Sequence, residues 1–226
     1  MTIAGKTPGQ NNEPLHEVIH IRHLTDSTYV LRFTRNKIQF RAGQHIIVGL
    51  KGEMDQREYS IYSGEDDDYL EILVKEVRDG NISSKLKTCK EGDLLDVNGP
   101  FGSFGIEKFD LHSKKHIFIA TGTGISPFHS MVCSYPDINY ILIHGVSTGK
   151  EAYERDSYKP EKYILCTSKE KYMGQRGRVT GYLTKFRVTG DMLFYLCGNG
   201  NMIYEAFHIL NDKGIMADKI ITEVYF

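Results

Sequence analysis

The hydrophobic pattern of this chain changes near residue 110, and this change limits the folds open to it. Between residue 16 and about residue 105, short stretches of alternating apolar and polar residues are separated by turn-forming segments rich in Gly and Asp. Many short strands at this spacing are typical of a small antiparallel barrel, here with six strands. The predicted strands are His16–Leu24, Tyr29–Thr34, Gln44–Leu50, Glu58–Tyr62, Tyr69–Val77 and Asp93–Val97.

Beyond residue 113, apolar strands alternate with helical segments. In the segment 201–213, Ile203, Phe207 and Leu210 are spaced four and three residues apart, which places them on one face of a helix. Strands that alternate with helices form a parallel sheet covered on both faces. We therefore expect a barrel domain over residues 1–108 and a five-stranded parallel-sheet domain over residues 109–226. The predicted sheet strands are His116–Ala120, Tyr140–His144, Lys162–Cys166, Met192–Cys197 and Lys219–Tyr225.

Charge and hydropathy exclude several classes of protein. Lys and Arg total 28 and Asp and Glu total 29, so the formal net charge is −1. Proteins bind nucleic acids largely by neutralising phosphate charges with Lys and Arg. Because this chain has no excess of these residues, we expect no nucleic-acid partner. Residues 1–14 are polar, and no stretch of about 18 apolar residues occurs, which predicts neither a signal peptide nor a transmembrane segment. We expect a cytoplasmic monomer.

The residues that most often bind metals are not arranged for that role. Cys89, Cys133, Cys166 and Cys197 are far apart in the sequence, whereas iron–sulfur and structural zinc sites use closely spaced ligands. The acidic run Glu65–Asp68 is interpreted as a solvated hairpin tip, because runs of like charge usually face water. We therefore expect no metal site and no disulfide framework.

Two glycine-rich turns follow predicted strands of the second domain. The first is 120–127, with Gly122, Gly124 and Pro127, and the second is 196–202. A turn between a strand and a helix exposes backbone N–H groups at the positive end of the helix, where phosphate binds favourably. A tight structural connection is the alternative for the first turn, which has the spacing of neither a Rossmann fingerprint nor a P-loop. For Cys197 in the second turn, the alternative is a buried apolar thiol.

Two segments of the barrel half also carry ligand-binding residue types. Arg57, Tyr59 and Ser60 alternate along one strand, where Arg grips pyrophosphate, Tyr stacks on flat rings and Ser hydrogen-bonds a ring nitrogen. The segment 80–86 follows the next strand and predicts a short helix that begins near a phosphate. Ordinary strand surface is the alternative for the first segment.

Taken in order, these segments resemble the ferredoxin–NADP reductase family over residues 16–226. The family order is Arg-x-Tyr-Ser, Gly-x-x-Ser-x-x-Leu, Gly-Thr-Gly-x-x-Pro, Cys-Gly-x-x-x-Met and a carboxyl-terminal aromatic residue. The matching residues here are Arg57, Tyr59, Ser60, Gly80, Ser83, Leu86, Gly122, Thr123, Gly124, Pro127, Cys197, Gly198, Met202, Tyr225 and Phe226. The resemblance implies a flavin-binding barrel followed by a nicotinamide-nucleotide domain, with FAD and NADP(H) as cofactors.

The resemblance assigns the barrel residues to FAD. It implies that Arg57 contacts the pyrophosphate, that Tyr59 packs on the isoalloxazine ring and that Ser60 hydrogen-bonds near its reactive nitrogen. The other positions that it implies for flavin contact are Glu58, Leu73, Val74, Lys75, Asn81, Ile82, Ser83 and Thr123.

The resemblance also implies that NADP(H), rather than NAD(H), is the nucleotide. Ser168, Lys169 and Arg178 occupy the positions where family members bind the 2′-phosphate, although Ser147 replaces a further Arg that is common there. Lys169 and Arg178 as ordinary solvated side chains are the alternative. The other residues implied for cofactor contact are Gly122, Gly124, Pro127, Cys197, Gly198, Asn199 and Met202.

The catalytic residues implied by the resemblance are Ser60, Cys197 and Glu223. Reduced nicotinamide would pass a hydride to the flavin, with Cys197 beside the nicotinamide and Glu223 near the reacting rings. Tyr225 or Phe226 would cover the flavin face that nicotinamide must occupy.

The implied partner is ferredoxin or flavodoxin. Lys85, Lys87 and Lys90 are candidates for a basic face that attracts such acidic carriers, with plain solubility as the alternative. Two other functions stay open at this point. The chain could be the detached reductase component of an oxygenase, or a binding module whose flavin site is vestigial.

Overall fold

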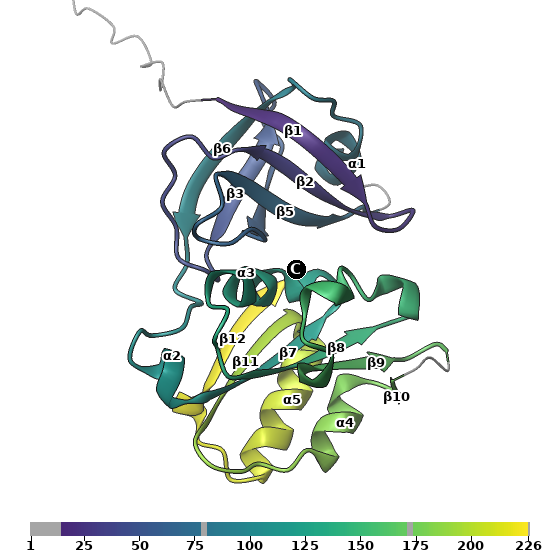
Figure 1. The fold of residues 1–226 in the computed structure, drawn as a ribbon. Coiled ribbons are helices and arrows are strands. Elements are labelled where there is room, and N and C mark those ends of the chain that lie inside the picture. The colour runs from purple at the N-terminus through teal and green to yellow at the C-terminus, as the bar shows by residue number, and fades with distance from the viewer. Residues whose placement is uncertain (1–14, 78–80, 171–173, 226) are drawn as a thin grey trace, which may run out of the picture.

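The computed structural model describes residues 15–77, 81–170 and 174–225. It contains a barrel and a parallel sheet, one above the other in Figure 1, joined by a single passage of the chain after β6. Phe226 and Gly80 lie outside the described residues.

The barrel confirms the predicted six antiparallel strands. Its strands run in the order β4-β3-β6-β1-β2-β5. Val18, Leu31, Phe33, Ile46 and Val48 are fully buried in its centre, as expected for the inward positions of alternating strands. The strands are β1 (His16–His23), β2 (Thr28–Thr34), β3 (His45–Leu50), β4 (Gln56–Ser60), β5 (Tyr69–Lys75) and β6 (Leu94–Phe101).

The two edge strands, β4 and β5, meet only at one end. An antiparallel bridge joins Ile61 to Ile72, and the Tyr62 N–H donates to the Glu71 carbonyl at 2.7 Å. Helix α1 (Asn81–Lys87) covers part of the barrel, with Ile82 and Leu86 buried in its core. Away from the bridge, the backbone groups on the outer edges of β4 and β5 are left for other partners.

The second unit is a parallel sheet with six strands, so the prediction of five is wrong by one. Its order is β10-β9-β8-β7-β11-β12. The strand missed, β10 (Gln175–Arg176), has two exposed residues and pairs with Cys166 and Thr167, so it has no hydrophobic pattern to detect. The other strands are β7 (Lys115–Thr121), β8 (Tyr140–Val146), β9 (Tyr163–Thr167), β11 (Met192–Asn199) and β12 (Ile220–Tyr225).

Helices cover both faces of this sheet. Along β7, Ile117 and Ile119 pack with residues of α4 and α5, whereas Phe118 and Ala120 pack with residues of α3. Successive side chains of a strand point to opposite faces, which explains the division. The helices are α2 (Asp110–Ser113), α3 (Ser126–Ser134), α4 (Val179–Lys185) and α5 (Gly200–Asp212), with short 3₁₀ turns η1 (Gly122–Ile125), η2 (Gly149–Glu151), η3 (Arg155–Ser157), η4 (Pro160–Lys162) and η5 (Ala217–Lys219).

Helix α3 lies between the sheet and the barrel (Figure 1) and fastens the two units together. His129 stacks on Tyr62 with ring centroids 3.7 Å apart, and its Nδ1 lies 2.7 Å from the Tyr62 carbonyl oxygen. The Ser130 hydroxyl donates to the Ser63 carbonyl at 2.7 Å. The segment that follows β4 is therefore held directly against the second unit.

The acidic run after this segment is not the fully solvated tip that the sequence suggests. The Glu65 carboxylate accepts hydrogen bonds from the Ala42 N–H at 2.7 Å and from the Tyr135 hydroxyl, and the Asp67 carboxylate accepts from the Gly64 N–H at 2.7 Å. Charge density alone did not reveal the Glu65 contacts, because Ala42 and Tyr135 are distant from Glu65 in the sequence.

The segment between β8 and β9 also contacts the barrel. Arg22 pairs with Glu154 at 2.7 Å, Lys75 pairs with Glu151 at 3.2 Å, and the Tyr153 hydroxyl lies 3.2 Å from the Thr28 hydroxyl. These polar contacts surround the apolar core that the two units share and fix their relative orientation.

Gly43 lies in this shared core and provides a test of it. Its φ is +100°, and a Cβ there would lie 1.7 Å from the Phe104 carbonyl oxygen and 2.7 Å from Met131 Cε. We expect Gly43→Ala to cost about 3 kcal/mol or more of unfolding free energy, measured by urea denaturation. The control is Gly52→Ala, where φ is +77° with no atom within 4 Å, so only backbone strain of about 1–2 kcal/mol applies. Equal losses in the two variants would contradict the close packing at Gly43.

Candidate functional site

A cavity of about 620 Å³ opens at the carboxyl edge of the parallel sheet. In the sheet, β8, β9 and β10 extend to one side of β7, and β11 and β12 extend to the other. The crevice at such a reversal of strand order is where open α/β sheets bind ligands. Both predicted glycine turns reach it, through Gly122, Thr123, Gly198, Asn199 and Met202.

A buried histidine holds the first glycine turn in place. No sequence motif indicated this residue. Gly122 has φ +54°, and its carbonyl oxygen lies 2.9 Å from His144 Nε2. His144 Nδ1 lies 2.7 Å from the Tyr163 hydroxyl. Burial lowers the pKa of His144 to about 4, so the ring is neutral and one nitrogen donates while the other accepts.

The second turn is held against the first. Gly198 has φ +126°, and a Cβ there would lie 2.4 Å from Thr121 Oγ1, so only glycine fits. The Asn199 N–H donates to Thr121 Oγ1 at 3.0 Å. The Asn199 side chain caps α5 by accepting from the Asn201 N–H at 3.0 Å.

Two predicted residues of the first turn do not line the cavity. Gly124 is buried, and a Cβ there would lie 2.5 Å from the Cys197 carbonyl oxygen. Pro127 is buried in the first turn of α3. Gly124 therefore allows the turn to pack against β11, Pro127 lies where the chain enters α3, and neither residue lines the cavity.

The far end of the cavity contains polar and basic side chains. Ser168 and Arg178 line it, as does Lys75 from the barrel, whose ammonium group pairs with Glu151. Lys169 is exposed beside the cavity rather than in its lining. Because Glu151 belongs to the same lining and compensates Lys75, Arg178 is the lining cation that can attract an anionic group.

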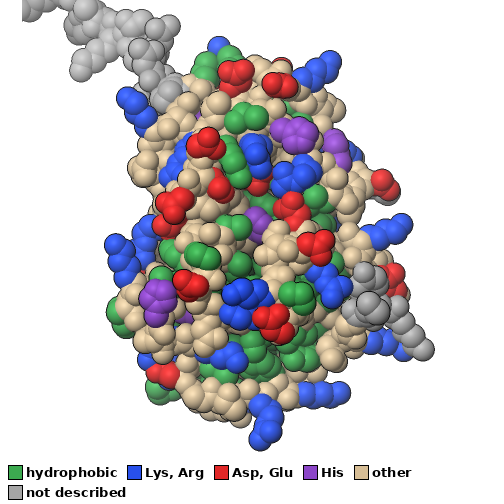
Figure 2. All heavy atoms as spheres, in the orientation of Figure 1, with side chains coloured by type: hydrophobic (Ala, Val, Ile, Leu, Met, Phe, Trp, Pro, Cys, Tyr) green, Lys and Arg blue, Asp and Glu red, His purple; other side chains and the backbone are tan. Residues whose placement is uncertain are grey.

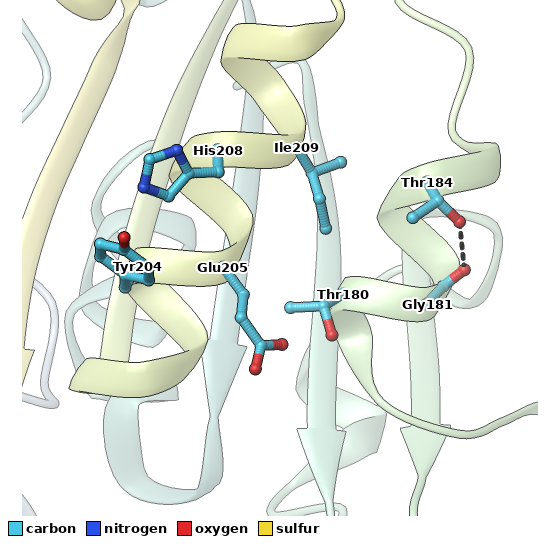
Figure 3. Close-up of a pocket in the computed structure, with 7 residues that line it drawn as sticks. All are labelled: Thr180, Gly181, Thr184, Tyr204, Glu205, His208 and Ile209. Carbon is cyan, nitrogen blue, oxygen red and sulfur yellow. Dashed lines mark hydrogen bonds between the residues drawn. The ribbon is translucent and has the colours of Figure 1, made fainter.

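A second hollow of about 590 Å³ continues from this cavity between α4 and α5 (Figure 3). Thr180 and Glu205 belong to the lining of both. In Figure 3, the Glu205 side chain extends toward Thr180, whereas Tyr204 and His208 lie together on the side of α5 away from Thr180. The cavity thus widens onto the outer surface between the two helices.

The near end of the cavity reaches the seam between barrel and sheet, where predicted residues from both units converge. The Tyr225 hydroxyl donates to Ser60 Oγ at 2.6 Å, and Ser60 Oγ donates to Glu223 Oε2 at 3.2 Å. Cys197 Sγ lies 4.0 Å from the same carboxylate oxygen. Tyr225 also lines the cavity, so this cluster and the two glycine turns form one continuous site.

Burial controls the ionisation of this cluster. It raises the pKa of Glu223 to about 7, opposed by the hydrogen bond from Ser60 and assisted by the nearby charge of Glu58. It also raises the pKa of Cys197 well above its usual value, so the sulfur is a neutral thiol rather than a thiolate. The pKa of Tyr225 is raised for the same reason. Glu223 is therefore the group of this cluster that changes charge near neutral pH.

His45 is a further member of the cluster that the sequence analysis missed. Its Nδ1 lies 3.7 Å from Glu223 Oε1, and in the β3–β4 ladder it is the direct partner of Ser60. The sequence did not show the pairing register of β3 and β4, which places His45 opposite Ser60. A strand containing His45 was predicted, but not which residue it faces.

The predicted residues of β4 line the open edge of the barrel. Arg57 and Glu58 are exposed, and Arg57 Nη1 donates to the Gln56 carbonyl at 2.9 Å. Within the described ranges, no ion pair involves Arg57. Tyr59 is half-buried, and burial raises the pKa of its hydroxyl to about 12. Arg57 therefore offers a guanidinium group beside an aromatic ring.

The predicted residues on the opposite edge are more deeply buried. Leu73 and Val74 are in the core, so only their backbone faces the gap between β4 and β5. Ile82 is buried, and the Ser83 hydroxyl accepts from the Val77 N–H at 3.1 Å. The side chains of Ile82 and Ser83 are thus occupied inside the barrel. The side chain of Asn81, like Phe226, lies outside what the structure describes.

Two negative observations complete the description of the site. Among the described residues, no three His, Cys, Asp or Glu side chains are arranged to hold a metal ion. None of the helices in the described ranges is long and apolar enough to span a bilayer.

Comparisons with known proteins give a consistent result. Residues 16–106 match the oxidoreductase FAD-binding domain family. The chain is 28% identical over 240 residues to a ferredoxin–NADP reductase of Azotobacter vinelandii, covering 91% of this chain and 92% of that protein. It is 32% identical over 199 residues to the flavodoxin/ferredoxin–NADP reductase of Rhodobacter capsulatus, covering 77% and 73%.

Two further similarities extend the comparison. The toluate 1,2-dioxygenase electron transfer component of Pseudomonas putida is 26% identical over 225 residues, covering 92% of this chain and 66% of that protein. A crystal structure of a ferredoxin NADP⁺ reductase from Neisseria gonorrhoeae with bound FAD and NADP has a TM-score of 0.80 at 22% identity, covering 94% of this chain and 98% of that chain. At that identity the structural likeness concerns the fold.

The pH dependence of the unfolding free energy tests whether His144, which supports the first glycine turn, is buried in the neutral form. Because the folded protein keeps this ring neutral, with its pKa near 4 rather than 6.5, the unfolded chain binds more protons between these values. Its contribution to stability is complete above about pH 6.5 and is lost as pH falls. Between about pH 7.5 and pH 5, we expect wild type to lose roughly 2 kcal/mol more unfolding free energy than His144→Gln.

Urea denaturation at the two pH values measures this difference. The matched control is His208→Gln, which changes an exposed histidine of α5. If wild type, His144→Gln and His208→Gln lose the same amount on acidification, His144 is not buried in the neutral form.

Proposed function

Because the chain belongs to the ferredoxin/flavodoxin–NADP reductase family, we propose that it moves electrons between NADP(H) and a ferredoxin or flavodoxin. It is a flavoprotein oxidoreductase, and FAD and NADP(H) are its cofactors. The specific activity that we propose is that of a ferredoxin–NADP reductase.

We assign one cofactor to each unit. Residues 1–108 form the FAD-binding barrel and residues 109–226 form the NADP-binding domain. This division falls between the end of β6 and the start of α2. It leaves each unit with its own sheet, which supports the assignment.

The observation that carries the proposal is the hydrogen bond from Ser60 to Glu223. It joins the last residue of a barrel strand to the end of a sheet strand, beside the cavity that Tyr225 lines. A flavin bound along β4 and a nucleotide bound in the cavity would meet at this point. Proximity of the two reacting rings is the main requirement for hydride transfer.

The residues present at the barrel edge fit FAD. The Arg57 guanidinium is exposed and suits a pyrophosphate group, and Tyr59 offers a ring face for a flat heterocycle. The edges of β4 and β5 supply backbone donors and acceptors in the gap beyond the Ile61–Ile72 bridge. In this assignment, Glu58, Leu73, Val74 and Lys75 belong to the walls of the flavin site, as do Asn81, Ile82, Ser83 and Thr123.

The cavity fits a dinucleotide phosphate. Its glycine turns give close backbone approach, and Ser168 with Arg178 supplies a donor and a cation for a 2′-phosphate. We assign Lys169, which is exposed beside the opening, to the same phosphate. Gly122, Gly198, Asn199 and Met202 line the path between this end and the seam.

Bound together, the cofactors supply hydride transfer between nicotinamide and flavin, followed by release of electrons one at a time. In this scheme Ser60 orients the reacting ring through its hydroxyl group. Cys197 presents a neutral thiol at the ring edge, since burial keeps it protonated. Glu223 holds or releases a proton near neutral pH. The Tyr225 ring would cover the site when no nicotinamide is bound, and we assign Phe226 to the same covering segment.

Two of the three lysines expected to attract a carrier are engaged in ion pairs. Lys85 pairs with Glu53 and Lys87 pairs with Glu76 at 2.6 Å, whereas Lys90 is exposed and has no ion pair within the described ranges. On the face seen in Figure 2, basic and acidic side chains are interspersed. We therefore assign carrier recognition to shape and local charge near the seam rather than to a continuous basic patch.

A role as the reductase component of an oxygenase is the second candidate. The similarity to the toluate dioxygenase electron transfer component favours it, because that protein covers nearly all of this chain. The choice depends on which acceptor receives the electrons, so it can be tested directly.

The proposed activity is tested by oxidation of NADPH and NADH with ferredoxin or flavodoxin as acceptor. We expect the purified protein to be yellow, to contain FAD and to reduce at least one of the two carriers with NADPH. Ferricyanide serves as a control acceptor that needs no specific docking. Turnover with ferricyanide but with neither carrier would favour the oxygenase role. A colourless protein that takes up no FAD would contradict both.

The double variant Lys169→Ala/Arg178→Ala tests the choice of nucleotide. Removing both cations should raise KM for NADPH about 10- to 100-fold and change KM for NADH little, since only NADPH has the 2′-phosphate; one phosphate contact contributes about 1–3 kcal/mol. Lys185→Ala, in the last turn of α4, is the matched control. Equal changes for both nucleotides would exclude a 2′-phosphate role.

A further inference from the structure

We propose that Glu205 and Thr180 recognise the base of the bound nucleotide, and that the hollow between α4 and α5 selects adenine over purines that carry an oxygen at position 6. These two residues thereby determine specificity at a place that the phosphate-binding residues do not cover. The inference rests on the proposed function, and its test separates the two.

The hollow lies next to the place assigned to the 2′-phosphate. Arg178 comes immediately before α4, and Thr180 is the second residue of this helix. In an adenine dinucleotide phosphate, the base is attached to the ribose carbon next to the one that carries the 2′-phosphate. A phosphate held by Arg178 therefore leaves the base close to Thr180, at the opening shared by the cavity and the hollow.

One wall of the hollow has an open space over Gly181. This glycine lies inside α4, and no heavy atom of another part of the chain is within 4 Å of where its Cβ would be. Glycine inside a helix is less favourable than alanine, and neither close packing nor a left-handed backbone requires it here. A flat ring that approaches the helix backbone would use this space. Ile209 of α5 supplies an apolar surface facing it (Figure 3).

Thr180 brings a hydroxyl group without a partner to this space. The residue is only 8% exposed, and within the described ranges no group forms a hydrogen bond with its side chain. It lines both the cavity and the hollow. Since buried polar side chains are nearly always hydrogen-bonded, the Thr180 hydroxyl indicates a ligand that supplies the missing partner.

Glu205 contributes a carboxylate from the opposite side. Its side chain extends toward Thr180 (Figure 3), and it forms neither an ion pair nor a hydrogen bond with the described part of the chain. A carboxylate repels phosphate, so its place in the lining of a phosphate-binding cavity is unfavourable unless the ligand also offers a donor. Because an ionised carboxylate only accepts hydrogen bonds, the ligand group that meets Glu205 must be an N–H or O–H donor.

Adenine has the groups that this pair requires. It carries an amino group, which donates, beside a ring nitrogen that accepts. Glu205 can accept from the amino group while the Thr180 hydroxyl donates to the ring nitrogen. A purine with an oxygen at position 6 would present an acceptor to Glu205 instead. A site built to bind a particular N–H group rejects analogues that lack it, so the hollow should discriminate between the two bases.

Isothermal titration calorimetry of the FAD-containing protein tests this inference without turnover. The ligands are NADP⁺ and its analogue with hypoxanthine in place of adenine. We expect wild type to bind NADP⁺ about tenfold more tightly than the analogue. Glu205→Gln should bring this ratio close to one, because the Gln amide can donate to the oxygen of hypoxanthine. Asp212→Asn, at the exposed end of the same helix, is the matched control and should keep the wild-type ratio.

A second variant fills the space over Gly181. Gly181→Ala should raise the midpoint of urea denaturation, because alanine favours the helix, and should weaken NADP⁺ binding about tenfold, because its methyl group occupies space assigned to the base. A purely structural role would not move stability and affinity in opposite directions. Lys185→Ala, in the same helix, is the control and should leave NADP⁺ affinity unchanged.

The outcomes distinguish this inference from the proposed function. If wild type binds NADP⁺ and the hypoxanthine analogue equally, or if Glu205→Gln keeps the wild-type ratio, Glu205 does not recognise the base and the reductase function stands. A titration with NAD⁺ and its own hypoxanthine analogue repeats the comparison without the 2′-phosphate. If wild type binds none of these nucleotides, the proposed function fails and the inference fails with it.

Discussion

The attachment of α3 to the segment after β4 is the constraint on which the rest of this molecule depends. His129 and Ser130 are buried and bond to the carbonyls of Tyr62 and Ser63, backbone groups that would otherwise be buried without partners. Leaving a buried polar group unpaired costs about 1–3 kcal/mol, so the barrel and the sheet have a strong preference for one relative orientation. Since Ser60 lies only two residues before Tyr62, this attachment also sets where Ser60 meets the sheet.

The hydrogen bond between Ser60 and Glu223 connects the arrangement of the two units to the ionisation of the proposed reaction site. A carboxylate at the end of an exposed edge strand would ionise normally. Here the barrel covers it, and burial raises its pKa to about 7. Burial also raises the pKa of the Cys197 thiol. The raised pKa of Glu223 is thus tied to the contact between the two units, in which Ser60 of the barrel hydrogen-bonds to this carboxylate.

The cavity has a closely packed floor and an exposed far end, and the two parts have different roles. Its floor is fixed by close packing, with Gly198 against Thr121 and the neutral His144 beneath Gly122. Its far end is exposed and basic at Arg178, and it continues into the hollow between α4 and α5. A fixed floor positions a ligand, while an exposed cationic end attracts and releases it.

The sequence by itself determined the class of each unit and most of the candidate site, because strand period, glycine turns and spaced motifs are local properties. It predicted the barrel, the parallel sheet and the convergence of both glycine turns on one edge. It missed β10, which has no hydrophobic pattern, and it missed His45 and His144. Only the tertiary structure decided these, together with the compensation of Lys85 and Lys87 by carboxylates. The physical reason is that strand register, burial and ion pairing join residues distant in sequence, such as Ser60 and Glu223, and no local pattern encodes which partners will meet.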